Sequence, residues 1–147
     1  MNELFIRDAV PSDVSEIEKI EKASFSTPWS EKWLTDEINN TEDFFWVATD
    51  GKDIFGYAVV GNVGTEAELY NIAVSPEHRG KGIGDMLMRY MTDKAVDKGT
   101  GSLFLEVRES NSAAIRLYEK HGFKAVGRRR GYYREPTEDA ILMMRTL

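Results

Sequence analysis

A strand pattern, a glycine-rich loop and a helix pattern follow one another without interruption in the middle of the chain. Glu68–Val74 has the β-prone sequence ELYNIAV, and residues 76–84 form a loop that holds three glycines. Apolar residues then recur at helical spacing from Ile83 to Lys98. A strand that leads through a short loop into a helix is a building unit of α/β and α+β proteins. This segment therefore favours a mixed α/β fold.

The same loop has the properties of an anion-binding site. The first N–H groups of a helix have no intrahelical partner, the helix dipole favours negative charge there, and glycine lets an anion approach the backbone closely. Arg79 and Lys81 add positive charge to a chain whose net charge is −6. The spacing Arg79-x-x-Gly82-x-Gly84 fits neither a P-loop nor a G-x-G-x-x-G dinucleotide loop. We therefore predict a phosphate or pyrophosphate site of another class, with a plain strand-to-helix connection as the alternative.

Strand and helix patterns alternate along the rest of the chain, joined by short turns. Further strands are predicted at 4–7, 44–49, 54–60, 102–107, 123–126 and 140–144, and further helices at 13–23, 30–38 and 111–121. Asp13 and Glu16 have the spacing of a capping box, Ser30 is a candidate N-cap, and Gly61–Thr65 is predicted to be a turn. Asp50-Gly51 is a hairpin signal, so the two strands that flank it are expected to be antiparallel.

Composition excludes several classes of function. A length of 147 residues predicts one domain over residues 1–147. The chain has no cysteine and only two histidines, His78 and His121, without ligand spacing, so neither thiolate chemistry nor a metal site is expected. Its acidic balance makes it a poor general nucleic-acid binder. No apolar run approaches the length of a membrane span and no signal peptide pattern is visible, so a cytoplasmic location without membrane contact is expected.

Several motifs together resemble the GNAT N-acetyltransferases. Arg79–Gly84 (RGKGIG) is similar to the acetyl-CoA loop of that family, and Leu105–Arg108 followed by Asn111–Phe123 is similar to its second conserved block. Shorter segments resemble the subfamily of ribosomal-protein-alanine N-acetyltransferases: Pro28–Ser30, Glu68–Val74, Arg129–Tyr133 and Glu138–Ala140. The resemblance covers nearly the whole chain.

The resemblance implies a GNAT fold and acetyl-CoA as co-substrate, with no metal. The fold is a mixed, mostly antiparallel sheet flanked by helices and splayed between its fourth and fifth strands, here 68–74 and 102–107, with the cofactor in the gap. The implied cofactor-binding residues are Ile72, Ala73 and Val74 on the fourth strand, Arg79, Gly80, Lys81, Gly82, Ile83 and Gly84 in the loop, and Asn111 and Tyr118 near the following helix.

Two residues acquire catalytic roles through the same resemblance. Glu106 stands in the otherwise apolar segment SLFLEV, where the residues alone favour a solvated strand-end carboxylate. Tyr118 lies on an apolar helix face, where the residues alone favour a core position. The resemblance implies that Glu106 is the general base that deprotonates the amine and that Tyr118 is the acid that protonates the departing thiolate.

The implied acceptor is the N-terminal alanine of a ribosomal protein, namely protein eighteen of the small subunit. Trp29, Glu68, Tyr132 and Tyr133 are the candidate acceptor-binding residues. Two alternatives remain open: a GNAT enzyme that acts on a small amine or a lysine side chain, and an acyl-CoA-binding module without catalysis. The presence of both Glu106 and Tyr118 favours an enzyme. The oligomeric state is open, with a monomer as the simplest expectation.

Overall fold

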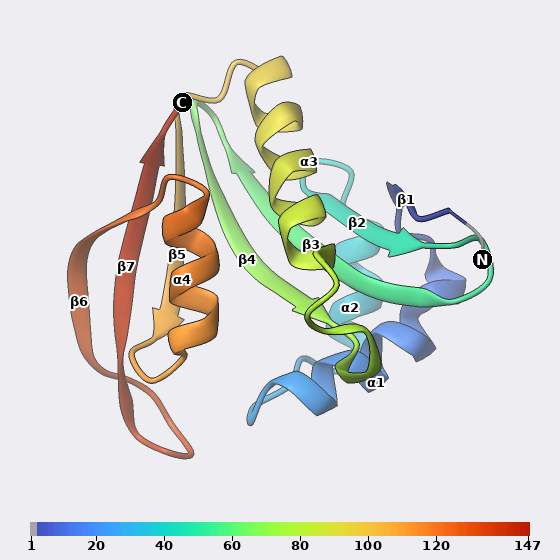
Figure 1. Ribbon diagram of the computed structural model, residues 1–147, viewed down its shortest axis with the longest axis horizontal. Helices are drawn as coiled ribbons and strands as arrows, with labels where there is room; N and C mark the ends of the chain where they lie inside the picture. The colour runs from blue at the N-terminus through green and yellow to red at the C-terminus, as the bar shows by residue number, and fades with distance from the viewer. Residues whose placement is uncertain (1–2) are drawn as a thin grey trace.

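Seven strands form one mixed sheet in the computed structural model, which describes residues 3–147 (Figure 1). The strands are β1 (Phe5–Asp8), β2 (Phe44–Thr49), β3 (Ile54–Val63), β4 (Glu66–Val74), β5 (Ser102–Arg108), β6 (Lys124–Tyr133) and β7 (Glu138–Thr146). The helices are α1 (Val14–Ser24), α2 (Glu31–Ile38), α3 (Ile83–Asp97) and α4 (Ser112–Lys120), with short 3-10 turns at Pro11–Asp13 and Pro76–His78. The sheet order is β1-β2-β3-β4-β5-β7-β6, and every neighbouring pair is antiparallel except β4 and β5.

The sheet divides where β4 and β5 stop pairing. Their parallel ladder joins Glu66–Leu69 to Ser102–Leu105, and beyond it the two strands diverge while β4 stays paired with β3 as far as Val74 (Figure 1). The predicted mixed fold, splayed between the fourth and fifth strands, is confirmed. One edge of β4 is therefore left without a strand partner from Tyr70 onward.

The N–H and C=O groups of successive β4 residues point alternately toward β3 and toward this free edge. Ser75 N donates to Phe55 O at 2.8 Å, which directs the polar groups of Ser75 toward β3. Successive residues of a strand direct their N–H and C=O groups to opposite edges. The groups of Ile72 and Val74 therefore face the gap, whereas those of Ala73 face β3.

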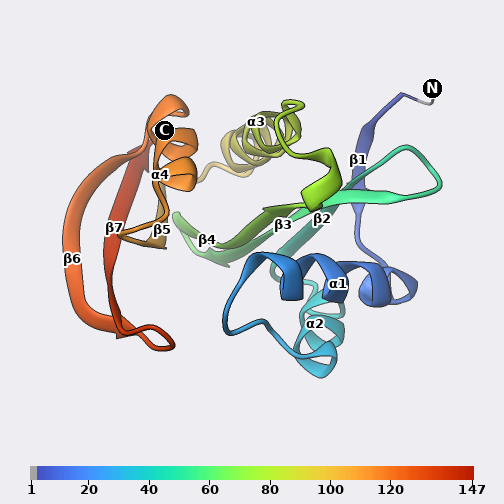
Figure 2. The same ribbon diagram turned by 60° about the horizontal axis from the view of Figure 1, so that its bottom comes forward.

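Two hydrophobic clusters cover the two faces of the sheet. Alternate side chains of a strand point to opposite faces, so Trp46 and Ala58 pack beneath α3, whereas Phe45 and Val47 pack against α1 and α2. Figure 2 shows α3 on one side of the sheet and α1 and α2 on the other. The first cluster also continues to α4 through Tyr118, so one core joins the two halves of the divided sheet. None of the helices within residues 3–147 is long and apolar enough to cross a membrane.

Tertiary contacts altered two of the predicted turns and caps. The turn predicted at Gly61–Thr65 is wrong in its first half, because β3 continues to Val63 and Gly61 lies in the strand, where a Cβ would collide with the Tyr70 ring. The capping box predicted from Asp13 is also wrong. Its carboxylate accepts from Arg7 Nη1 at 2.8 Å and from Val10 N at 2.8 Å, so it braces the preceding turn.

One cap formed as predicted, and one strand is much longer than expected. Ser30 Oγ accepts from Trp33 N at 3.1 Å and caps α2. Strand β6, predicted only at 123–126, runs through the arginine run 128–130 to Tyr133. It is an edge strand whose side chains are almost all exposed. Solvent on its open side removes the apolar alternation by which strands are recognised in a sequence.

Candidate active site

A cavity of about 420 Å³ lies over the paired part of β4 and β5 and extends to Glu106, next to the point where the two strands separate. Residues of β4, β5, β6 and β7 line it, among them the charged side chains of Glu68, Glu106 and Arg129 and the apolar side chains of Phe104 and Met143. Glu106 is the first residue of β5 after the last pair with β4, Leu69 to Leu105. The end of the ladder therefore places its side chain at the start of the gap.

Glu106 has its own set of polar neighbours inside this cavity. Its side chain is 20% exposed, and Arg129 Nε lies 3.3 Å from its Oε1. The Glu106 carboxylate also accepts a hydrogen bond from the Tyr132 hydroxyl, and this contact raises the pKa of Tyr132. Burial, followed by the charge of Glu106, raises the pKa of Glu68. Two carboxylates with one arginine make a site suited to a cationic amine.

Tyr118 reaches the same region from the other face of the sheet. Its side chain is buried in the cluster that contains Leu105 and Val107, whereas Glu106, between them in β5, points to the opposite face. Burial, with the nearby Tyr133 as a smaller cause, raises the pKa of the Tyr118 phenol. The hydroxyl therefore keeps its proton at neutral pH and is a hydrogen-bond donor.

The glycine loop presents an uncapped helix N-terminus, as the sequence predicted. Gly80 and Gly82 have φ values of +77° and +82°, a region that side chains disfavour, and no side chain caps α3. Nothing lies within 4 Å of either glycine's Cβ position, and no side chain at the N-cap bonds to the first-turn N–H groups of α3, the kind of groups that bind anions. Lys81 is exposed beside them, whereas the side chain of Ile83 is buried in the core.

Arg79 is placed differently from the other loop residues. Its Nε donates to Val74 O at 3.1 Å and its Nη2 donates to Ser24 Oγ at 3.1 Å. The side chain thus braces the loop against the end of β4 and against α1. The sequence predicted that Arg79 adds positive charge to the loop, but it did not predict these contacts, because Ser24 is far away in the chain.

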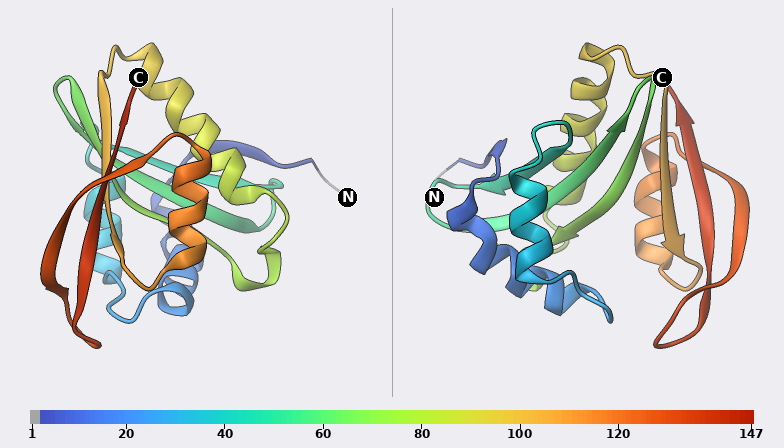
Figure 3. Two further views of the ribbon diagram at one scale, coloured as in Figure 1. Left: turned by 60° about the vertical axis from the view of Figure 1, so that its left-hand side comes forward. Right: turned by 180° about the vertical axis from the view of Figure 1, so that it is seen from behind.

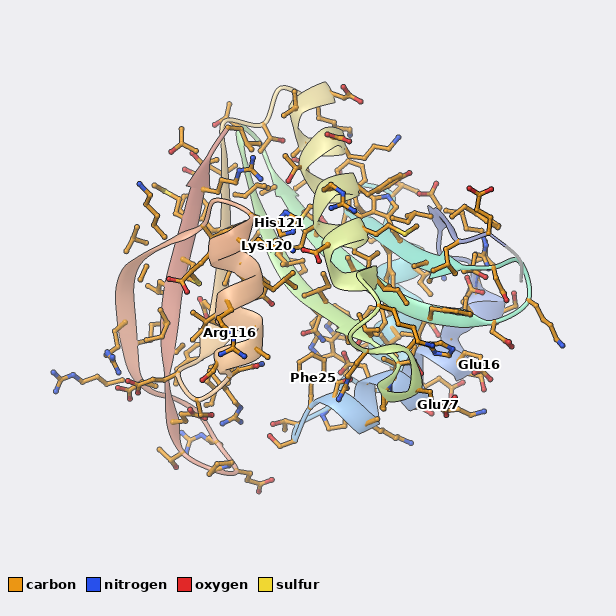
Figure 4. The ribbon with its side chains drawn as sticks, in the orientation of Figure 1. Glu16, Phe25, Glu77, Arg116, Lys120 and His121 are labelled. Carbon is orange, nitrogen blue, oxygen red and sulfur yellow. The ribbon has the colours of Figure 1, made fainter. Side chains whose placement is uncertain are left out.

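Helices α3 and α4 are joined to each other at the edge of the gap. Asp85 of α3 lies 2.8 Å from His121 Nε2 and 3.1 Å from Lys120 Nζ, and both contacts lower the pKa of Asp85. Figure 4 shows both partners at the end of α4 that faces α3. Gly84 lies so near Leu117 that a Cβ on it would be 3.3 Å from Leu117 Cδ2.

The remaining predicted residues lie around these features. Asn111 caps α4, since its Oδ1 accepts from Ala114 N at 3.2 Å. Tyr132 and Tyr133 form an edge-to-face pair on β6 with centroids 5.1 Å apart. Trp29 lies outside the cavity lining, stacks on Trp33 at 3.7 Å, and is held by a bond from its N to Glu21 Oε2 at 2.8 Å.

Sequence reasoning missed Arg129 as a separate residue. It treated residues 128–130 as one basic run, but Arg129 points to Glu106 while Arg128 pairs with Glu109 and Asp139 outside the cavity. Strand alternation was the available signal, since it places the middle arginine on the other face. Within residues 3–147 no group of three or more His, Cys, Asp or Glu side chains has an arrangement that could hold a metal ion.

Residues 14–123, more than half of the chain, match the acetyltransferase (GNAT) family. This chain is a GNAT acetyltransferase. As a member of that family it uses acetyl-CoA as its co-substrate. It is 40% identical over 128 residues to the ribosomal protein bS18-alanine N-acetyltransferase of Escherichia coli K12, a match that covers 84% of each chain.

Solved structures of GNAT proteins share its whole fold. The crystal structure of the ribosomal-protein-S18-alanine N-acetyltransferase from Escherichia coli superimposes with a TM-score of 0.90 at 34% identity, covering 98% of this chain and 94% of that one. The crystal structure of the NatC complex bound to Gag peptide and CoA matches with a TM-score of 0.86 at 25% identity, covering 99% of both chains.

Gly84→Val is expected to weaken acetyl-CoA binding at least about tenfold, equivalent to 1.4 kcal/mol. The branched side chain enters the space between α3 and Leu117 and forces the two helices of this GNAT domain apart next to the predicted diphosphate site. Isothermal titration calorimetry of the folded variant measures the effect. Gly101→Ala is the matched control, because its added Cβ meets only Thr65 O at an ordinary 3.5 Å. Equal affinities for Gly84→Val and the native chain would contradict the loop assignment.

Proposed function

We propose that residues 1–147 act as one GNAT domain that acetylates the α-amine of an N-terminal alanine on a ribosomal protein, with bS18 as the acceptor. The observation that carries the proposal is the pair of carboxylates, Glu68 and Glu106, in one cavity next to the point where β4 and β5 divide. The name of the Escherichia coli relative, which refers to this acceptor, supports the same choice.

In the proposed complex, acetyl-CoA lies in the gap between β4 and β5. The backbone groups of Ile72 and the N–H of Val74, which face the gap, pair with its pantetheine arm, while Val74 O accepts from Arg79. The N–H groups at the start of α3 and the loop 79–84 bind the diphosphate, because a helix N-terminus stabilises negative charge. Asn111 contacts the arm with the amide nitrogen that its capping bond leaves available. Ala73 contributes by packing alone, since its backbone groups face β3.

Acetyl transfer first requires a neutral amine. An α-amine has a pKa of about 8, so most of it is protonated at neutral pH and has no free electron pair. Glu106 accepts this proton, and the amine nitrogen then attacks the thioester carbonyl carbon. A tetrahedral intermediate forms with negative charge on the carbonyl oxygen. Arg129, beside Glu106, helps to hold the carboxylate in position for the amine.

Collapse of the intermediate breaks the carbon–sulfur bond and completes the amide. The electron pair of that bond goes to sulfur, and the nitrogen releases its second proton to solvent as the amide forms; solvent later returns a proton to Tyr118 and takes one from Glu106. Tyr118 donates a hydrogen bond and then its proton to the departing thiolate. Burial keeps the phenol protonated until that step. The products are the acetylated N-terminus and free CoA.

A peptide with the N-terminal sequence of bS18 is expected to be acetylated on its α-amine. The two carboxylates attract a cationic chain end, and Trp29, Tyr132 and Tyr133 bind the residues that follow it. A peptide with a blocked N-terminus and internal lysines is expected to react about 100-fold more slowly, because a lysine with pKa near 10.4 is harder to deprotonate by roughly 3 kcal/mol. Mass spectrometry locates the acetyl group.

The matched control peptide replaces the first alanine by a bulky residue and is expected to be a poor acceptor. Acetylation found mainly on lysine, or only on polyamines added to the assay, would assign this enzyme to the small-amine and lysine class. Acetyl-CoA binding without transfer to any acceptor would instead indicate a binding module.

A further inference from the structure

Arg108, the last residue of β5, donates three hydrogen bonds to the β6–β7 hairpin. Its Nη2 donates to Arg134 O at 2.9 Å, and its Nη1 donates to Pro136 O at 2.9 Å and to Glu138 Oε1 at 3.2 Å. The side chains of Arg108 and Glu138 are only 21% and 15% exposed. Several fixed acceptors around one planar guanidinium orient it firmly.

The same guanidinium also reaches the opposite side of the divided sheet. Its Nη2 lies 3.2 Å from Ser26 Oγ, in the segment between α1 and α2. Figure 2 shows this segment and the hairpin on either side of the space beneath the sheet, and the rear view in Figure 3 shows them near each other at the open end. Arg108, two residues beyond Glu106 on the same face of β5, therefore connects the hairpin to the segment between α1 and α2.

Arg108 is also connected to the candidate acceptor residues. Its Cζ lies 4.5 Å from the centroid of the Tyr133 ring, and Tyr133 packs edge-to-face on Tyr132. Burial and the charge of Glu106 raise the pKa of Tyr133 to about 12, which places this ring in the field of the proposed base. On the other wall, Glu21 binds Trp29 N from a buried position.

We propose that Arg108 is a positioning residue that sets the distance between the two walls of the acceptor groove. Its bonds to the hairpin hold it to one wall, and its bond to Ser26 holds the α1–α2 segment at a defined separation from Tyr133. The inference rests on the proposed function, since the groove is the proposed site of the acceptor peptide. Arg108 acts through the groove walls and does not touch the reacting atoms.

Ser26→Ala removes the bond across the groove and leaves every hairpin contact of Arg108 in place. We expect the KM for the Ala-starting peptide to rise about fivefold, the size of one partly exposed hydrogen bond, with acetyl-CoA affinity unchanged. Arg108→Lys keeps the charge but loses the planar guanidinium with its several fixed N–H donors, and it is expected to raise this KM at least about tenfold. Thr27→Ala, at the next exposed position, is the control and is expected to match the native chain. An unchanged KM in Ser26→Ala would overturn the proposal.

A distance measurement tests the same proposal without an acceptor. Because the chain has no cysteine, nitroxide labels on Thr27→Cys and Thr137→Cys attach only at those two positions. Pulsed electron paramagnetic resonance measures the distribution of distances between the two labels. We expect this distribution to be broader in the labelled chain that carries Ser26→Ala than in the labelled chain that keeps Ser26. Identical distributions would overturn the role of Arg108. Absence of peptide acetylation by the native enzyme would contradict the proposed acceptor, and the distance measurement would still decide whether Arg108 holds the walls together.

Discussion

Glu106→Gln is expected to lower kcat for the Ala-starting peptide by roughly 10²–10⁴, the usual contribution of a general base. The substitution keeps the size of the side chain and its contact with Arg129 but removes the group that accepts the proton of the amine. Steady-state assays over pH 6–9 measure the effect. An α-amine with pKa about 8 loses its proton unaided as the pH rises, so the defect is expected to shrink toward pH 9.

Glu109→Gln is the matched control for this experiment. Glu109 follows the same strand and pairs with Arg128 outside the cavity, with a side chain 49% exposed. Its replacement is expected to leave turnover close to that of the native enzyme. Native turnover by Glu106→Gln at every pH from 6 to 9 would show that Glu106 is structural and that another group, with Glu68 the next candidate, removes the proton.

Tyr118→Phe is expected to lower kcat about 100-fold, within the range of general acid catalysis, while acetyl-CoA binds nearly as before. The phenyl ring preserves the packing with Phe123, whose ring centroid lies 6.1 Å away, so only the proton donor is lost. In a cofactor analogue with a more acidic thiol, the thiolate leaves readily without being protonated. Its use is therefore expected to reduce the difference between the variant and the native enzyme.

Tyr90→Phe is the control for loss of a tyrosine hydroxyl on a helix that packs on the same core. Tyr90 stands on α3 and packs edge-on against Trp46 at 5.2 Å, away from the gap. It is expected to retain native kcat. If Tyr118→Phe behaves in the same way, and the acidic-thiol analogue makes no difference, Tyr118 is a core residue and the thiolate leaves without its proton.

Local patterns in the sequence determined most of the elements. Apolar residues at helical or alternating spacing predicted the strands and helices of the first 120 residues, and Ser30 capped α2 as its position indicated. The glycines at 80 and 82 predicted an open helix N-terminus, and the positive φ values found there belong to a region that glycine adopts readily. Motif resemblance, rather than periodicity, led to the GNAT family and to acetyl-CoA.

Tertiary structure decided which side chains meet. The parallel ladder ends at Leu69 and Leu105, which places Glu106 at the start of the gap, and the packing of α4 buries Tyr118 in the cluster on the opposite face of β5. Alternation along β6 directs one arginine of three to the other face, and the order of the strands in the sheet brings that arginine to Glu106. The contact of Arg108 with Ser26 joins residues 82 positions apart. Residue types and spacing encode local conformation, whereas strand register and contacts between distant segments depend on how the whole chain packs. The glycine loop, most of the strands and the family were therefore predictable from the sequence alone, whereas the length of β6 and the geometry of the acceptor groove were not.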